Sequence, residues 1–61
     1  MPFITIDLFE GRDVQTKREL VERITAETCK VLKCQPESVH VRINNVKRED
    51  WGTAGVLWSD K

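Results

Sequence analysis

The residue with the greatest chemical potential is Pro2, because removal of Met1 leaves a secondary amine at the start of the chain. We expect that removal, since a small second residue such as proline normally permits it. A free α-amino group has a pKa of about 7.7–8.0, lower than that of lysine. Burial in an apolar pocket and nearby cations both disfavour the charged ammonium form and bring such an amine toward neutral pH. A base of this kind can take an acidic proton beside a carbonyl and return it elsewhere.

Two arginines, a histidine and a tryptophan are candidates to surround that amine. Arg12 and Arg42 carry planar guanidinium groups, which bind carboxylate or carbonyl oxygens through paired hydrogen bonds. His40 shares a predicted strand face with Arg42 and can hydrogen-bond a carbonyl. Trp51 offers a large apolar ring that excludes water. Each has an ordinary alternative role: Pro2 merely leads a strand, Arg12 is an exposed loop residue, and the others serve packing.

Composition limits the classes of partner. The chain has 61 residues, enough for a single domain over 1–61, and a chain this short buries only about 60% of the surface that its unfolded form exposes. Ten basic residues balance ten acidic ones, so nucleic acid and anionic lipid are not expected partners. No apolar run approaches the roughly 18 residues of a membrane span. We expect a small-molecule substrate in a local pocket.

The cysteine count disfavours a stabilising metal. Cys29 and Cys34 are the only cysteines, and the single His40 cannot complete a four-ligand zinc site. The first residues lead into acidic side chains instead of the basic region and apolar core of a secretory signal, so we expect a cytoplasmic location with free thiols. No cofactor is expected. Self-association is then the remaining stabiliser for so small a chain.

The hydrophobic pattern predicts a strand, a helix and a second strand. Residues Phe3–Phe9 alternate β-branched and apolar types between two faces, as in a buried strand. Residues Val14–Leu32 contain no Gly or Pro and repeat apolar residues at helical spacing. Asp13 is the predicted N-cap, and Pro36 is predicted to end the helix. Residues Val39–Asn44 alternate strictly between apolar and polar, which predicts the second strand.

These elements predict an α+β fold. Two strands joined through a long helix make a parallel β-α-β unit, and residues 46–61 predict a turn, a short hairpin and a tail. One apolar stripe of the helix is expected to pack on the sheet. Its members are Val14, Leu20, Val21, Ile24, Thr28, Val31 and Leu32.

The other face of the predicted sheet has nothing to cover it. Phe3 and Phe9 lie there with His40 and Arg42, and a two-stranded sheet also leaves its edges open. Pairing of two sheets into four strands, followed by stacking of those pairs, would bury the face and the edges. We therefore expect a homo-oligomer, at least a dimer.

Three short motifs together resemble the 4-oxalocrotonate tautomerase family. They are Met1-Pro2 before an apolar strand, Leu8-Phe9-Glu10-Gly11-Arg12 at its end, and Asp50-Trp51-Gly52-Thr53-Ala54-Gly55 near the C-terminus. Their order and spacing cover nearly the whole chain. The resemblance implies β-α-β protomers that share a sheet in a homohexamer. It also implies a cofactor-independent isomerase, a tautomerase, that moves a proton on a 2-oxo acid or related enolisable carbonyl compound with the N-terminal proline as catalytic base.

The resemblance further implies roles for the candidate site residues. Arg12 would bind and polarise the substrate, and Trp51 would wall the pocket. The best known members carry a second arginine at the position of His40, donated across a subunit boundary. This chain has histidine there and Arg42 two residues later, and either side chain is a candidate for that role.

Two other functions remain open from the sequence. Hydration or dehalogenation of unsaturated acids on the same fold would use the proline as an acid, with Glu49 or Asp50 as a carboxylate that activates water. A noncatalytic oligomeric module would keep the fold without turnover.

Overall fold

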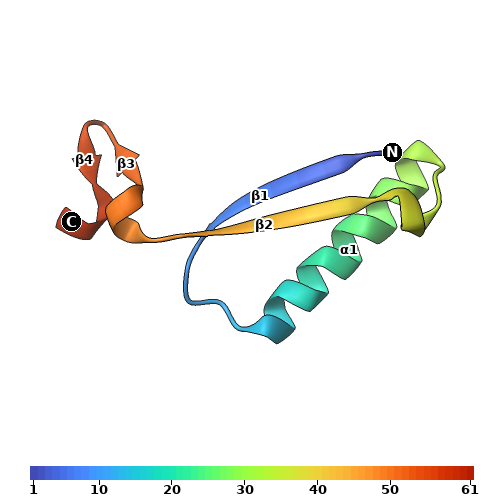
Figure 1. Ribbon diagram of the computed structural model, residues 1–61, viewed down its shortest axis with the longest axis horizontal. Helices are drawn as coiled ribbons and strands as arrows, with labels where there is room; N and C mark the ends of the chain where they lie inside the picture. The colour runs from blue at the N-terminus through green and yellow to red at the C-terminus, as the bar shows by residue number, and fades with distance from the viewer.

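The computed structural model describes residues 1–61 and contains two long strands, one long helix and a small C-terminal hairpin (Figure 1). The strands are β1 (Phe3–Phe9), β2 (His40–Val46), β3 (Gly52–Thr53) and β4 (Val56–Leu57), and the helix is α1 (Val14–Leu32). Single 3₁₀ turns occupy Pro36–Ser38, Arg48–Asp50 and Trp58–Asp60. The predicted α+β fold, a β-α-β unit with a C-terminal hairpin, is confirmed.

Strands β1 and β2 pair in parallel along their whole length, from Phe3 opposite His40 to Phe9 opposite Val46. The second strand was predicted over Val39–Asn44 and is displaced toward the C-terminus. Val39 instead closes the preceding 3₁₀ turn, where its N–H donates to the Pro36 carbonyl at 3.1 Å. The last two residues of β2 belong to the strand because they pair with the end of β1.

Helix α1 begins at its predicted cap and ends before its predicted stop. The Asp13 carboxylate accepts a hydrogen bond from the Thr16 amide at 2.9 Å, which satisfies one of the free N–H groups at the helix start. The chain leaves the helix at Lys33, whose left-handed backbone (φ 56°, ψ 47°) lets the Cys34 N–H donate to the Cys29 carbonyl at 3.2 Å. The prediction that Pro36 ends the helix is therefore wrong; this proline starts the following 3₁₀ turn.

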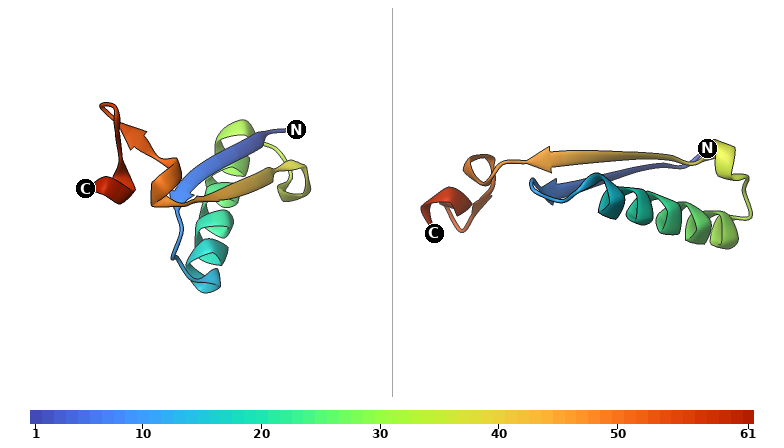
Figure 2. Two further views of the ribbon diagram at one scale, coloured as in Figure 1. Left: turned by 60° about the vertical axis from the view of Figure 1, so that its left-hand side comes forward. Right: turned by 90° about the horizontal axis from the view of Figure 1, so that it is seen from below.

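The sheet has one covered and one open face. Helix α1 lies along one face of the β1–β2 pair, and the opposite face carries no element (Figure 2, right). Ile4, Ile6 and Leu8 of β1 are half-buried on the helix side, whereas Phe3 on the open side is 73% exposed. The sequence correctly predicted this division of β1 between two faces.

The apolar stripe of α1 is only partly covered within one chain. Its central members are half-buried, as predicted, but three residues near its ends are exposed and the prediction is wrong for them within the single chain. These exposed residues are Val14, Val31 and Leu32. The helix of 19 residues is about 28 Å long, whereas each strand of seven residues spans about 23 Å, so the sheet does not cover both ends of the helix.

The C-terminal hairpin extends from the end of β2, away from α1 (Figures 1 and 2). Ala54 and Gly55 both have positive φ, 55° and 79°, which suits a tight two-residue connection between β3 and β4. The Trp58 ring N–H donates to the Thr53 hydroxyl at 2.7 Å, and the Trp58 backbone N–H donates to the Trp51 carbonyl at 2.8 Å. These bonds fold the tail back onto the hairpin.

The protomer is extended, with extents of 43 × 24 × 13 Å. Its radius of gyration is 14.6 Å, against about 10.5 Å for a compact chain of this length. Its accessible surface is 4933 Å², against about 4,100 Å² for a compact monomer of 7.1 kDa, and none of its 61 residues is fully buried. The protomer therefore leaves uncovered the apolar surface that a stable fold normally buries. No helix in the chain has the length and apolar character needed to cross a bilayer.

Candidate active site

Four of the five predicted site residues lie at the two ends of the sheet. Pro2 precedes β1 and is half-buried, and its carbonyl accepts the His40 N–H at 3.0 Å. This bond places the start of β2 directly beside Pro2. The His40 ring stacks on Phe3, with centroids 5.1 Å apart and an interplanar angle of 29°. Pro2 and His40 therefore share one end of the sheet, with the His40 ring held against an apolar neighbour.

Arg42 lies farther along the open face. It stands opposite Thr5 in the strand register and is exposed. Thr5 is three residues from Pro2, about 10 Å along the strand. Within the protomer Arg42 therefore lies apart from both ends of the sheet.

Arg12 and Trp51 occupy the far end. Trp51 packs against Phe9, the last residue of β1, with ring centroids 4.3 Å apart, and Trp58 packs on the same ring at 5.1 Å. Seven residue steps separate Pro2 from Phe9, which corresponds to about 23 Å along an extended strand. One small substrate cannot touch both ends, so a single protomer does not bring the predicted site together.

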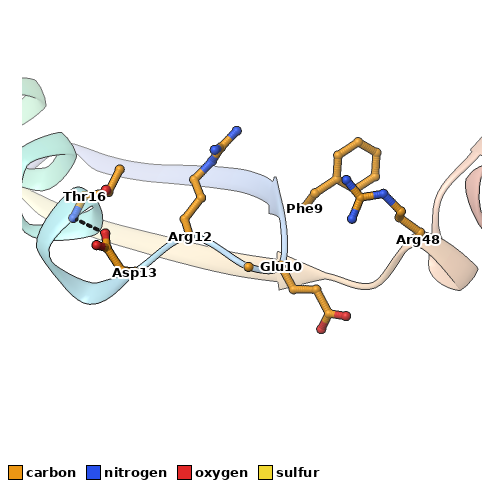
Figure 3. Close-up of a pocket in the computed structure, with 7 residues that line it drawn as sticks. Phe9, Glu10, Arg12, Asp13, Thr16 and Arg48 are labelled. Carbon is orange, nitrogen blue, oxygen red and sulfur yellow. Dashed lines mark hydrogen bonds between the residues drawn. The ribbon is translucent and has the colours of Figure 1, made fainter.

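A hollow of about 500 Å³ opens at this far end, and we call it the arginine hollow (Figure 3). It is lined by Phe9, Glu10, Gly11, Arg12, Asp13, Thr16 and Arg48. Pockets of about 300–1,000 Å³ are typical of small-molecule sites. The hollow thus has room for a small organic acid.

The turn between β1 and α1 sets the position of Arg12. The Glu10 N–H donates to the Val46 carbonyl at 3.0 Å, which continues the sheet hydrogen bonding to the edge of the turn. Gly11 then has a φ of 114°, a backbone region that residues with a Cβ rarely adopt. The chain reverses at Gly11, and Arg12 follows on the way to the Asp13 cap. The turn therefore requires a glycine at the position before Arg12.

Arg48 is a lining residue that the sequence interpretation missed. Its guanidinium carbon lies 4.7 Å from the centroid of the Phe9 ring, in cation–π geometry. Arg48 belongs to the 3₁₀ turn after β2, in a charged run predicted only as a turn. No local pattern connects it with Phe9, because the contact depends on the pairing of β1 with β2.

Among the charged residues of the hollow, Asp13 has a hydrogen-bond partner, whereas the two arginines have no carboxylate partner. The Thr16 side chain, and after it the Thr16 amide that donates to the Asp13 carboxylate, hold the pKa of that carboxyl below its usual value. The two salt bridges of the chain join Glu19 with Arg23 at 3.1 Å and Lys47 with Glu49 at 3.9 Å. Neither guanidinium group of the hollow therefore has a carboxylate partner within 4.0 Å.

A second hollow, of about 360 Å³, lies beside Trp51. Asp7 and Asp50 line it, and the Asp7 carboxylate accepts a hydrogen bond from the Asn44 amide at 2.9 Å. Of the two carboxylates considered for water activation, Asp50 is thus adjacent to the predicted pocket residue, whereas Glu49 is paired with Lys47.

Comparison with known proteins gives consistent matches along the whole chain. A family model described as tautomerase enzyme matches residues 2–61. A probable tautomerase of Halalkalibacterium halodurans is 36% identical over 61 residues, which is 100% of each chain. The crystal structure of a 4-oxalocrotonate tautomerase homologue superposes with a TM-score of 0.93 at 41% identity, covering 100% of this chain and 97% of the other. A 4-oxalocrotonate tautomerase isozyme structure from Methylibium petroleiphilum has a TM-score of 0.88 at 36% identity, covering 95% and 94%.

Proposed function

The chain belongs to the tautomerase enzyme family, and we propose that its base is the nitrogen of Pro2, freed by loss of Met1. The reaction is keto–enol proton transfer on a 2-oxo acid or a related enolisable carbonyl compound, without a cofactor. Met1 is 76% exposed, so the bond that must be cut is accessible. Because an amide nitrogen has no useful basicity, the chain that retains Met1 is inactive.

The observation that carries the proposal is the division of the candidate residues between the two ends of β1. Pro2 lies at the start of the strand, and Arg12 and Trp51 lie beyond its end. The sheet order is β1–β2, so one edge of β1 is unpaired. Antiparallel pairing of that edge with the same edge of a second copy places each Pro2 beside the far end of the other chain. Two copies then complete two sites.

In such a site each residue has a separate role in proton transfer, substrate binding or the exclusion of water. The Pro2 nitrogen takes the hydroxyl proton of an enol, and the electron pair of the broken O–H bond forms the new C=O bond. The electron pair of the former C=C bond then takes a proton from the protonated Pro2, at the carbon distant from the new carbonyl. Arg12 of the other copy binds a carboxylate or carbonyl oxygen and stabilises the negative charge that develops on it. Trp51 excludes water, which keeps the amine neutral and strengthens both interactions.

His40 and Arg42, on the open face of the sheet, are the remaining residues that we propose bind the substrate. His40 adjoins Pro2 and can hydrogen-bond the carbonyl of a substrate bound there. Arg42 projects from the face that stacks on another pair of copies, so it is positioned to reach a site across that contact. We propose a homohexamer of single-domain protomers, residues 1–61, in which three such pairs cover the open faces.

The experiment compares the mature chain, the chain that retains Met1, and Pro2→Ala in the mature background. The readout is ketonisation of 2-hydroxymuconate or of an arylpyruvate enol, followed by absorbance. A positioned general base contributes about 10²–10⁴-fold, so both altered chains are expected to lose at least about 10²-fold in kcat/KM. Titration of the ¹⁵N-labelled Pro2 nitrogen by NMR should give a pKa near neutrality. Equal rates for the mature chain and Pro2→Ala would refute the role of the amine.

A further inference from the structure

We propose that Cys29 and Cys34 form a redox-sensitive dithiol site, in which a small-molecule disulfide such as oxidised glutathione converts the two thiols reversibly into an intramolecular disulfide. The site uses none of the residues of the proposed active site and does not depend on their function. Both cysteines are free and half-buried, and they are the only cysteines of the chain. Any disulfide within one chain must therefore join these two residues.

The backbone at the end of α1 brings the two cysteines together. The Cys29 carbonyl accepts the N–H of Lys33, whose backbone is left-handed, and also the N–H of Cys34 at 3.2 Å. In helix ends of this kind, side chains at the positions of Cys29 and Cys34 frequently contact each other. Standard bond lengths and this hydrogen bond keep the two Cα atoms within about 7 Å of each other, the range that a disulfide can bridge.

The two thiols also influence each other. Burial of Cys29, and after it the side chain of Cys34, raises the pKa of the Cys29 thiol, and the Glu37 carboxylate adds to this effect. The Cys34 side chain acts on Cys29 by hydrogen bonding and by charge, and both effects need neighbouring sulfur atoms. Because the Cys29 thiolate forms less readily than that of an ordinary cysteine, Cys34 is the thiol that attacks first.

The reaction is thiol–disulfide exchange in two steps. The Cys34 thiolate attacks one sulfur of the small-molecule disulfide, so that a mixed S–S bond forms, the S–S bond of the reagent breaks and one reagent thiolate leaves. The Cys29 thiolate then attacks the Cys34 sulfur, and the second reagent thiolate leaves as the intramolecular bond forms. Two electrons pass from the protein to the reagent, and the two protons of the protein thiols end on the two released thiols. An excess of the reduced reagent reverses both steps.

The disulfide would join the end of α1 to the loop that leads into β2. This end of the helix lies near the N-terminus (Figure 1), and the loop continues through the turn Pro36–Ser38 to His40, whose N–H donates to the Pro2 carbonyl at 3.0 Å. Closing residues 29–34 into a ring restricts the unfolded chain and so stabilises the fold. Oxidation should therefore fix the segment that precedes β2.

The test incubates the protein with glutathione at a series of ratios of the oxidised to the reduced form, then blocks the remaining thiols by alkylation and measures the intact mass. Wild type should lose the mass of two hydrogen atoms and resist alkylation, and reduced glutathione should restore the starting mass. Cys29→Ser and Cys34→Ser, the matched controls, should each retain one glutathione instead. Cys29→Ser should acquire it faster, because this variant keeps the attacking thiol.

Variants of Lys33 test the geometry separately. Glycine adopts the left-handed conformation readily, whereas a β-branched residue does not. At the same glutathione ratio, Lys33→Gly should be oxidised at least as fully as wild type and Lys33→Val several-fold less. The oxidised wild type should melt several degrees above the reduced protein, a shift that Cys34→Ser should lack.

Three results would overturn the inference: wild type that accumulates only as glutathione adducts, a disulfide between two chains on a non-reducing gel, or equal oxidation of the two Lys33 variants. None of these measurements needs turnover. The activity of Pro2→Ala therefore decides the proposed base, and the mass of the oxidised protein decides the dithiol site separately.

Discussion

Arg12 is the residue whose chemistry depends most directly on its local backbone. It follows Gly11, whose φ of 114° turns the chain out of β1, and it lines the arginine hollow without a carboxylate partner. Replacing Arg12 by Gln should lower kcat/KM about 10²-fold, because a charge-assisted contact made to the developing oxyanion is lost. Steady-state kinetics on the mature protein provide the measurement.

The conservative variant separates charge from geometry at this position. Arg12→Lys keeps the positive charge but loses the planar fork, so it should recover part of the lost rate and not all of it. Circular dichroism should show the same helix content in both variants, since the Arg12 side chain is exposed and makes no hydrogen bond or salt bridge within the protomer. A Gln variant that turns over as fast as wild type would remove Arg12 from the mechanism.

The site residues differ in how far the sequence could identify them. Pro2, Arg12 and Trp51 belong to short motifs whose order along the chain is itself informative, so they were predictable as candidates. Arg48 was not, because its significance comes from a contact with Phe9 that forms only when the end of β2 meets the end of β1. For His40 the sequence predicted its strand face correctly but not that its ring stacks on Phe3.

Among the helices and strands, α1 offers the clearest test of a local sequence signal, its N-cap at Asp13. The Asp13 carboxylate caps the helix through the Thr16 amide. Hydrogen bonding from the Thr16 side chain, and after it from this amide, lowers the pKa of Asp13. An acidic group whose pKa is lowered by folding stabilises the folded protein at any pH above its unfolded-state pKa, which is about 3.9 for Asp. This stabilisation is lost as the pH falls through the pKa of the group in the folded protein. Asp13→Ala should therefore lower the thermal midpoint by several degrees at pH 7, and by less at a pH below the pKa of the folded protein.

Asp13→Asn is the control for this cap. Asparagine accepts the same amide hydrogen bond but does not titrate, so its thermal midpoint should lie near wild type at neutral pH and should not show the acid-dependent loss. Thermal melts at matched protein concentration allow the comparison, since assembly makes the midpoint concentration-dependent. A difference between Asp13→Ala and wild type that is the same at both pH values would contradict a role for the ionised carboxylate.

The boundaries of the elements show where local sequence is sufficient. Strand β1 has the predicted bounds and helix α1 begins at the predicted residue, because alternation, helical spacing and an Asp cap are all local. The end of α1 was predicted from Pro36, but the left-handed conformation of Lys33 ends the helix earlier, and lysine gives no signal for that conformation. The last residues of β2 could not be predicted because their strand geometry depends on pairing with β1.

At the scale of the whole molecule, the chain has the extended shape and exposed apolar surface that are typical of a subunit of an oligomer. It is longer and more exposed than a compact chain of 61 residues, and apolar side chains remain uncovered on the open sheet face and on α1. Small chains need some source of stability beyond a single core. Association through the open face and strand edges would provide it, and the same contacts would join the two halves of each site. Stability and activity should therefore be lost together when assembly fails.

Phe3 is the residue at which this coupling can be tested. It lies on the open face, 73% exposed, beside His40 and one residue from Pro2. Phe3→Glu places a charge where assembly would bury an aromatic ring, and burying an unpaired charge costs more than the roughly 1.5–3 kcal/mol that the ring contributes per copy. Sedimentation should show about 43 kDa for six copies of the 7.1 kDa wild-type chain and a smaller species for Phe3→Glu, with tautomerase activity lost in parallel.

Phe3→Leu keeps an apolar side chain at the same position and should remain assembled and active, which separates the effect of charge from the loss of the ring. Raising the concentration of Phe3→Glu should restore both mass and rate together, because the site forms only when the chains meet. The decisive observation is the activity of the dissociated protein. If the 7.1 kDa species turns over substrate at the wild-type rate, then Pro2 does not need the far end of another β1, and the division of the site between two copies is wrong.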